Sequence, residues 1–89
     1  MLIRSQDKRI LINMNNVSSI EVGDNELRIF ADDGETIYDL GEYSTKVKAM
    51  KVLDMIQEAY ERYEYEKAFK TGLTLFETFK MPEDGSVEV

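Results

Sequence analysis

The sequence predicts an α+β fold, with an antiparallel sheet of four or five short strands packed against one long helix and followed by a short last strand. Apolar and polar residues alternate through much of residues 1–40, which is the two-residue period of strands. Turn residues separate these runs at short intervals, and such connections favour an antiparallel meander. Residues 44–69 change to apolar steps of three and four, the period of a helix. The 89 residues suffice for one domain, which we place at residues 1–82.

Turn chemistry divides the first 40 residues into short strands. Asn15-Asn16 and Gly23-Asp24-Asn25 suit turns, because Asn tolerates a left-handed backbone and Gly adopts it freely. Asp33-Gly34 is the strongest hairpin signal and predicts a type I′ turn, with positive φ at both central residues. The predicted strands cover residues 2–5, 9–14, 17–22, 26–31 and 35–40.

The stretch from Ser44 to Phe69 is the predicted helix around which the domain is built. Ser44 or Thr45 is the expected N-cap, and Gly72 is the expected helix stop. Its apolar stripe requires a covering surface, which the sheet supplies. The stripe consists of Ala49, Val52, Leu53, Ile56, Ala59, Tyr60 and Tyr63.

The chain after the helix completes the predicted domain. Even spacing of apolar residues in Leu73–Met81 predicts a last strand, which Pro82 ends. Residues 83–89 are predicted to form a flexible acidic tail.

Composition argues against most kinds of catalytic site. The chain has no cysteine and no histidine, so common zinc, iron and copper sites and imidazole-activated nucleophiles are not available. No glycine-rich phosphate loop opens the helix. The carboxylates of Asp32, Asp33 and Glu35 do not follow EF-hand spacing and suit turn chemistry. We therefore predict a protein that is not an enzyme, with no catalytic residue, cofactor or metal.

The formal net charge of −7 also limits the classes of partner. It argues against direct nucleic-acid binding and against an anionic membrane surface, since both need clustered Lys and Arg. No apolar run approaches the roughly 20 residues that span a bilayer. Charged residues interrupt residues 1–12, so we expect no signal peptide and a cytoplasmic protein.

The helix carries a candidate interaction face near its C-terminal end. Acidic residues crowd this end although the helix dipole disfavours negative charge there. One interpretation is an acidic face that meets a basic partner, and the other is an ordinary solvated surface. Tyr65 lies off the core stripe and suits an interface, whereas Tyr60 and Tyr63 lie on the stripe. The candidate face consists of Glu58, Glu61, Glu64, Tyr65 and Glu66.

Leu11 and Phe30 fall on the sheet face opposite the predicted core residues. Curling of the sheet, the last strand or a second subunit would cover them, and the alternative is scattered apolar surface. We favour a homodimer.

Three stretches of the chain resemble a family. They are MLIRSQDKRILINMNNVSSIEV, LGEYSTKVKAMKVLDMIQEAY and FKMPED. Together they resemble a group of small uncharacterised proteins in low-GC Gram-positive bacteria and their prophages. The resemblance implies a bacterial or phage cytoplasmic setting and supplies no site residues. The matching positions are Ser5, Gln6, Gly41, Tyr43, Thr45, Ala49, Val52, Leu53, Met81 and Pro82.

Together these observations favour a non-enzymatic interaction protein that acts by surface contact with a protein partner, in an accessory or counter-defence role if the phage setting holds. One alternative is a small-molecule binder of nucleotide type, for which Arg4, Lys8, Arg9 and Arg28 are the local cations. A second alternative is a structural or assembly protein, which would form a large homo-oligomer.

Overall fold

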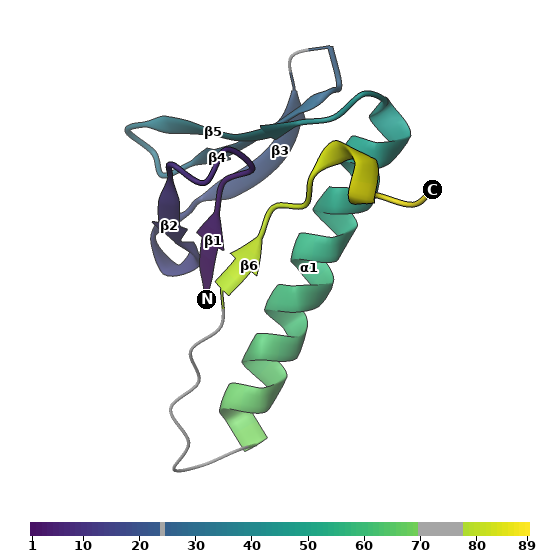
Figure 1. Ribbon diagram of the computed structural model, residues 1–89. Helices are drawn as coiled ribbons and strands as arrows, with labels where there is room; N and C mark the ends of the chain where they lie inside the picture. Colours follow the sequence, from purple (N-terminus) through teal and green to yellow (C-terminus); the bar gives the residue numbers. More distant parts are fainter. Residues whose placement is uncertain (24, 70–77) are drawn as a thin grey trace.

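The computed structural model describes residues 1–23, 25–69 and 78–89 and confirms the α+β class. Short strands precede one long helix, and a final strand returns beside the first (Figure 1). The predicted helix stop at Gly72 and the first part of the predicted last strand lie outside the described residues. The elements are β1 (Leu2–Arg4), β2 (Leu11–Asn13), η1 (Met14–Asn16), β3 (Ser19–Gly23), β4 (Arg28–Asp32), β5 (Ile37–Glu42), α1 (Lys46–Phe69), β6 (Thr78–Lys80) and η2 (Asp84–Ser86), where η marks a short 3-10 helix.

The strands form two small sheets and not the single antiparallel sheet that the sequence predicts. One sheet has the order β2-β1-β6, in which β1 is antiparallel to β2 and parallel to β6. The other is the antiparallel meander β3-β4-β5. η1 lies between β2 and β3, at the point where the chain passes from the first sheet to the second, and β3 pairs with β4 alone.

The β4–β5 hairpin is confirmed, but the prediction of a type I′ turn is wrong. Asp32 pairs with Ile37, which leaves a four-residue loop. Of the two predicted central residues only Gly34 has a positive φ, of 96°. The carboxylate of Asp33 holds the loop instead, since it accepts the backbone N–H groups of Glu35 and Thr36 at 2.9 and 2.7 Å. An aspartate that bonds its own turn in this way makes a second left-handed residue unnecessary.

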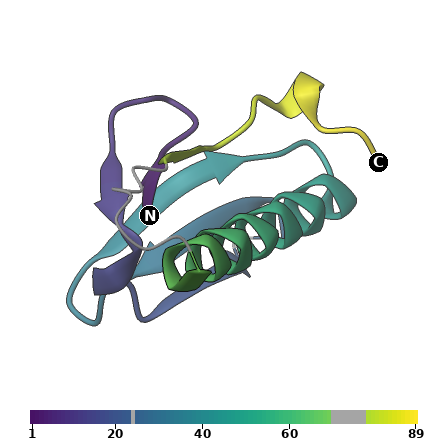
Figure 2. The same cartoon turned by 90° about the horizontal axis from the view of Figure 1, so that it is seen from below.

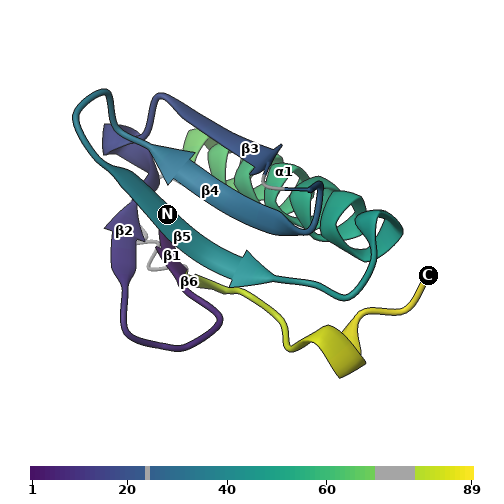
Figure 3. The ribbon, with the colours of Figure 1, turned by 90° about the horizontal axis from the view of Figure 1, so that it is seen from above.

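The helix covers one face of the β3-β4-β5 sheet (Figures 2 and 3). Thr45 is the N-cap, because its hydroxyl accepts the backbone N–H of Lys48 at 3.1 Å. The predicted stripe faces the sheet, with Leu53, Tyr60 and Tyr63 half-buried at its margins. Its fully buried members are Ala49, Val52, Ile56 and Ala59.

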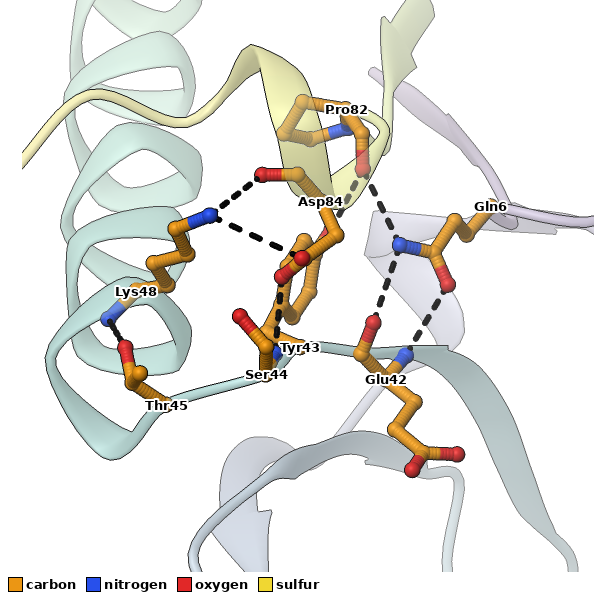
Figure 4. A network of polar contacts seen from close by, with 8 residues as sticks. All are labelled: Gln6, Glu42, Tyr43, Ser44, Thr45, Lys48, Pro82 and Asp84. Atoms are coloured by element: carbon orange, nitrogen blue, oxygen red, sulfur yellow. Dashed lines mark hydrogen bonds and ion pairs between the residues drawn. The ribbon is translucent and has the colours of Figure 1, made fainter.

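Gln6 ties the two sheets together (Figure 4). Its side-chain amide donates to the carbonyl of Glu42 and accepts the N–H of Glu42, both at 3.0 Å, so it binds β5 as a neighbouring strand would. Its backbone N–H donates to the carbonyl of Leu40 at 2.7 Å. A Cβ at Gly41 would lie 3.1 Å from the Cβ of Gln6, so the absence of a side chain permits this close approach.

Part of the segment predicted as a flexible tail, residues 83–89, packs against the domain. Asp84–Ser86 forms η2, and Val87 is buried in the main core cluster. The buried hydroxyl of Tyr43 donates to the carbonyl of Pro82 at 2.8 Å, which fixes the chain at the start of this segment. The sequence pattern is polar here because Val87 is the one buried apolar residue of the segment, and the Asp84 carboxylate and hydrogen bonds supply the other contacts.

Candidate functional site

The outward surface of α1 brings together part of the predicted interaction face. Glu58, Glu61 and Tyr65 are all exposed and lie on the side of the helix away from the sheet. At 3.6 residues per turn they fall within about 60° of one another around the axis. Phe69 lies on the same side, because it follows Tyr65 by four residues. We call Glu58, Glu61, Tyr65 and Phe69 the outer face of α1.

An aromatic pair forms the apolar part of this outer face. The ring centroids of Tyr65 and Phe69 are 4.7 Å apart, and the ring planes are tilted by 39°. The two residues are 65% and 72% exposed, so their contact with each other leaves most of both surfaces in water. Phe69 was not among the predicted site residues, although its spacing of four from Tyr65 is a signal present in the sequence.

Glu64 and Glu66 do not join the outer face. Both are half-buried, and they lie on opposite flanks of the helix, about 160° apart around its axis. Glu64 lies beside the hydroxyl of Tyr60, and the hydrogen bond to this carboxylate raises the pKa of Tyr60. Glu64 thus belongs to the margin of the core stripe.

Two lysines at the start of α1, Lys46 and Lys48, have acidic partners from other parts of the chain. Lys46 pairs with Glu26 at 3.0 Å. The ammonium of Lys48 lies 3.6 Å from the Asp84 carboxylate and donates to the Asp84 carbonyl at 2.9 Å (Figure 4). These partners offset the unfavourable placement of cations at the positive end of the helix dipole.

The polar network around Tyr43 and Asp84 joins the start of the helix to the C-terminal segment, and we call it the C-terminal junction. Asp84 accepts the backbone N–H of Ser44 at 2.7 Å, and this bond is the main reason that the pKa of Asp84 lies below its ordinary value. Burial raises the pKa of Tyr43, with Glu83 and Asp84 as weaker causes, so the hydroxyl stays protonated and keeps its bond to the C-terminal segment. The described residues contain no buried side-chain N or O atom without a hydrogen-bond partner.

The cations that the sequence suggests for a small ligand do not all lie at one site, because Arg28 lies apart from Arg4 and Lys8. Arg28 pairs with Asp39 and with Glu42 on the neighbouring strand, so carboxylates already engage it. Arg4 and Lys8 line a hollow of about 520 Å³ on the β2-β1-β6 sheet, together with Lys80. The sequence analysis missed Lys80, because only the parallel pairing of β6 with β1 brings it beside Arg4.

Leu11 and Phe30, on which the predicted homodimer rests, lie in different sheets. Leu11 is exposed on β2, whereas Phe30 is half-buried on β4. A Cβ at Gly23 would contact the Phe30 ring at 3.5 Å, so the ring covers this glycine on the neighbouring strand. The homodimer stays a prediction.

The described residues include neither a cluster suited to a metal ion nor a membrane-spanning helix. Within residues 1–23, 25–69 and 78–89, no group of three or more His, Cys, Asp or Glu side chains could hold a metal ion. In the same ranges, no helix combines the length and the apolar character that crossing a membrane requires.

Comparison with known proteins adds no family to these observations. The predicted resemblance to small bacterial and prophage proteins therefore stays a prediction. The chain matches no protein-family model, no curated protein and no solved structure.

Proposed function

We propose that this chain is a non-enzymatic interaction protein of the cytoplasm that acts by binding a protein partner through the outer face of α1. The bacterial or prophage setting is part of this proposal. The observation that carries it is the exposed Tyr65–Phe69 pair, since large aromatic residues are enriched at the centres of protein interfaces.

The size of the aromatic pair indicates what it can contribute. A fully buried aromatic side chain removes about 150–250 Å² from water. At exposures of 65% and 72%, Tyr65 and Phe69 leave roughly 200–340 Å² to be covered by a partner. A specific interface needs about 800 Å² on each side, so the pair would form the centre of the interface and neighbouring residues its rim.

The charges around the pair indicate the chemistry of the partner. Glu58 and Glu61 lie on the same side of the helix and are exposed. Arg62 follows Glu61 in the sequence and has an interaction of its own. A partner surface with an apolar groove and a Lys- or Arg-rich rim would complement this arrangement, and the rim charges would mainly set the association rate and the selectivity.

Affinity capture from a bacterial lysate, quantified by mass spectrometry, tests the proposal when it is run with matched variants. Tyr65→Ser with Phe69→Ser removes the aromatic centre. Truncation of an interface anchor typically costs about 2 kcal/mol or more, which is about 30-fold in affinity. We expect one specific protein to be lost from the captured set, and Ile37→Ser, at another exposed apolar position, to retain it.

A second pair of variants tests the acidic rim, with a control variant that changes the net charge by the same amount. Glu58→Lys with Glu61→Lys should slow association with the captured protein and weaken its salt dependence. Glu21→Lys with Glu35→Lys makes the same change in net charge at exposed positions away from α1. Equal capture by all variants, with thermal unfolding unchanged, would refute the assignment of the binding surface to α1.

A further inference from the structure

We propose that the hollow on the outward face of the β2-β1-β6 sheet binds a small phosphorylated molecule. The hollow has a volume of about 520 Å³, which lies within the range of small-molecule sites. No residue of α1 lines it, so this site is independent of the interaction face proposed above. Its lining residues are Arg4, Ser5, Lys8, Leu11, Thr78, Lys80 and Met81.

The register of the strands places two cations side by side. Arg4 on β1 pairs with Leu11 on β2 and with Lys80 on β6, so these three residues form one row across the sheet. The adjacent positions Ile3 and Ile12 are buried, which shows that the row of Arg4 faces outward. Strands lie about 4.8 Å apart, so the side chains of Arg4 and Lys80 start from neighbouring backbone positions.

Nothing on the described surface neutralises this pair. Among the described residues, the lining of the hollow includes no Asp or Glu, and none of Arg4, Lys8 and Lys80 makes an ion pair with a described residue. Like charges directly beside each other destabilise a sheet. An anion bound between them would remove this repulsion. The lack of a carboxylate among the described residues of this lining is unexpected in a chain that has 18 acidic and 11 basic residues.

The third cation is held in an unusual backbone conformation. Lys8 has φ of 68°, which residues other than Gly, Asn and Asp adopt at a cost. Its backbone N–H donates to the carbonyl of Ser5 at 2.9 Å. The one acidic residue of this loop, Asp7, is turned onto its own loop, because it accepts the Ser5 hydroxyl at 2.7 Å and the Arg9 N–H at 3.0 Å. Lys8 thus lines the same hollow as Arg4, and the described residues give it no acidic partner within its own loop.

The mixture of side chains specifies the class of ligand. Arg and Lys together favour a phosphoryl group, since Arg binds its oxygens in a fork and Lys adds a point charge. Thr78 adds a hydroxyl at the same wall. Leu11 and the largely buried Met81 supply an apolar wall, which suits an organic body attached to the phosphoryl group.

Titration of the ¹⁵N-labelled chain with ADP, followed by NMR, tests this site. We expect saturable shifts confined to residues 4–11 and 78–81, with an affinity in the micromolar to low-millimolar range. Arg4→Gln with Lys80→Gln should weaken ADP binding about tenfold or more, because two charged contacts to phosphate are lost. Lys51→Gln with Lys67→Gln makes the same change in net charge outside the hollow and should leave binding unchanged.

A measurement without ligand distinguishes a site from a merely structural pair. If Arg4 and Lys80 repel each other, Arg4→Gln with Lys80→Gln should raise the thermal midpoint of the free protein while it weakens ADP binding. A lowered midpoint would show that the two cations are stabilised within the chain and would contradict the inference. Absence of saturable shifts with ADP, equal binding by both double variants, or binding of a single-stranded oligonucleotide but not of ADP would overturn it.

Discussion

Replacement of Ile56 by alanine tests the packing of α1 on the sheet. Ile56 is 3% exposed on the core side of the helix. The change removes three carbons, which is about 2.4 kcal/mol at about 0.8 kcal/mol for each buried methylene. A hollow of about 390 Å³ borders Ile56 between α1 and β3, so the new space merges with an existing one and the added cavity cost is small. The better helix propensity of Ala returns a few tenths. We expect a loss of about 2–3 kcal/mol.

Urea unfolding followed by circular dichroism measures this loss. A domain of this size typically has a stability of about 5–10 kcal/mol, so Ile56→Ala should remain folded, with a midpoint about 1–2 M lower. Val47→Ala is the matched control, since Val47 is 62% exposed on the outward side of the same helix. This control should change the stability by less than about 0.5 kcal/mol. Equal losses for the two variants would refute the packing described here.

The C-terminal junction gives two further predictions. Tyr43→Phe should cost about 1 kcal/mol, because the hydroxyl bond to the Pro82 carbonyl is lost while Gln6 still donates to that carbonyl at 3.3 Å; Tyr65→Phe is the exposed control, and equal urea midpoints would contradict the role of the bond. Asp84→Asn should lower the stability at pH 7, and the difference from the unchanged chain should shrink as the pH falls below 3.8. The reason is that the folded-state pKa of Asp84 is lowered from 3.8, so its stabilisation is present above that pH and is lost as the carboxylate is protonated in the folded state. A difference that stays the same at pH 3 and pH 7 would exclude a contribution from the ionised carboxylate.

Local sequence patterns predicted the parts of the fold that depend on local physics. The helical stripe was predicted correctly, because burial of Val52 and Ile56 follows directly from a period of three and four. The hairpin at Asp33-Gly34 was predicted from its residues, whereas its turn type was not, since the carboxylate of Asp33 replaces the second left-handed residue.

The arrangement into two sheets depends on pairings that no local pattern contains. Arg4 lies beside Lys80 although they are 76 positions apart in the sequence, and Ser44 donates to Asp84 across 40 positions. Both contacts depend on the return of the chain after α1. The hollow on the β2-β1-β6 sheet could therefore not be predicted from the sequence, although Arg4 and Lys8 were identified there as candidate ligand-binding cations.

Several residues on which the predicted resemblance to bacterial and prophage proteins rests make contacts that hold the fold together. Gln6 and Gly41 are in close contact, and Tyr43 donates to Pro82. Ser5 is buried and accepts the backbone N–H of Ile10 at 3.0 Å. These contacts give Ser5, Gln6, Gly41, Tyr43 and Pro82 structural roles, whereas the outer face of α1 and the hollow have no such role in the fold.

Site-specific photo-crosslinking in the cells that encode this chain tests most directly whether the outer face of α1 is the partner surface. A benzophenone amino acid in place of Tyr65 keeps an exposed aromatic ring at the centre of the face. The same amino acid in place of Ile37 on β5 is the control, because this position is equally exposed and does not belong to α1. We predict a discrete heavier adduct with one protein from position 65 and none from position 37. No adduct from position 65, or the same adducts from both positions, would contradict the central claim.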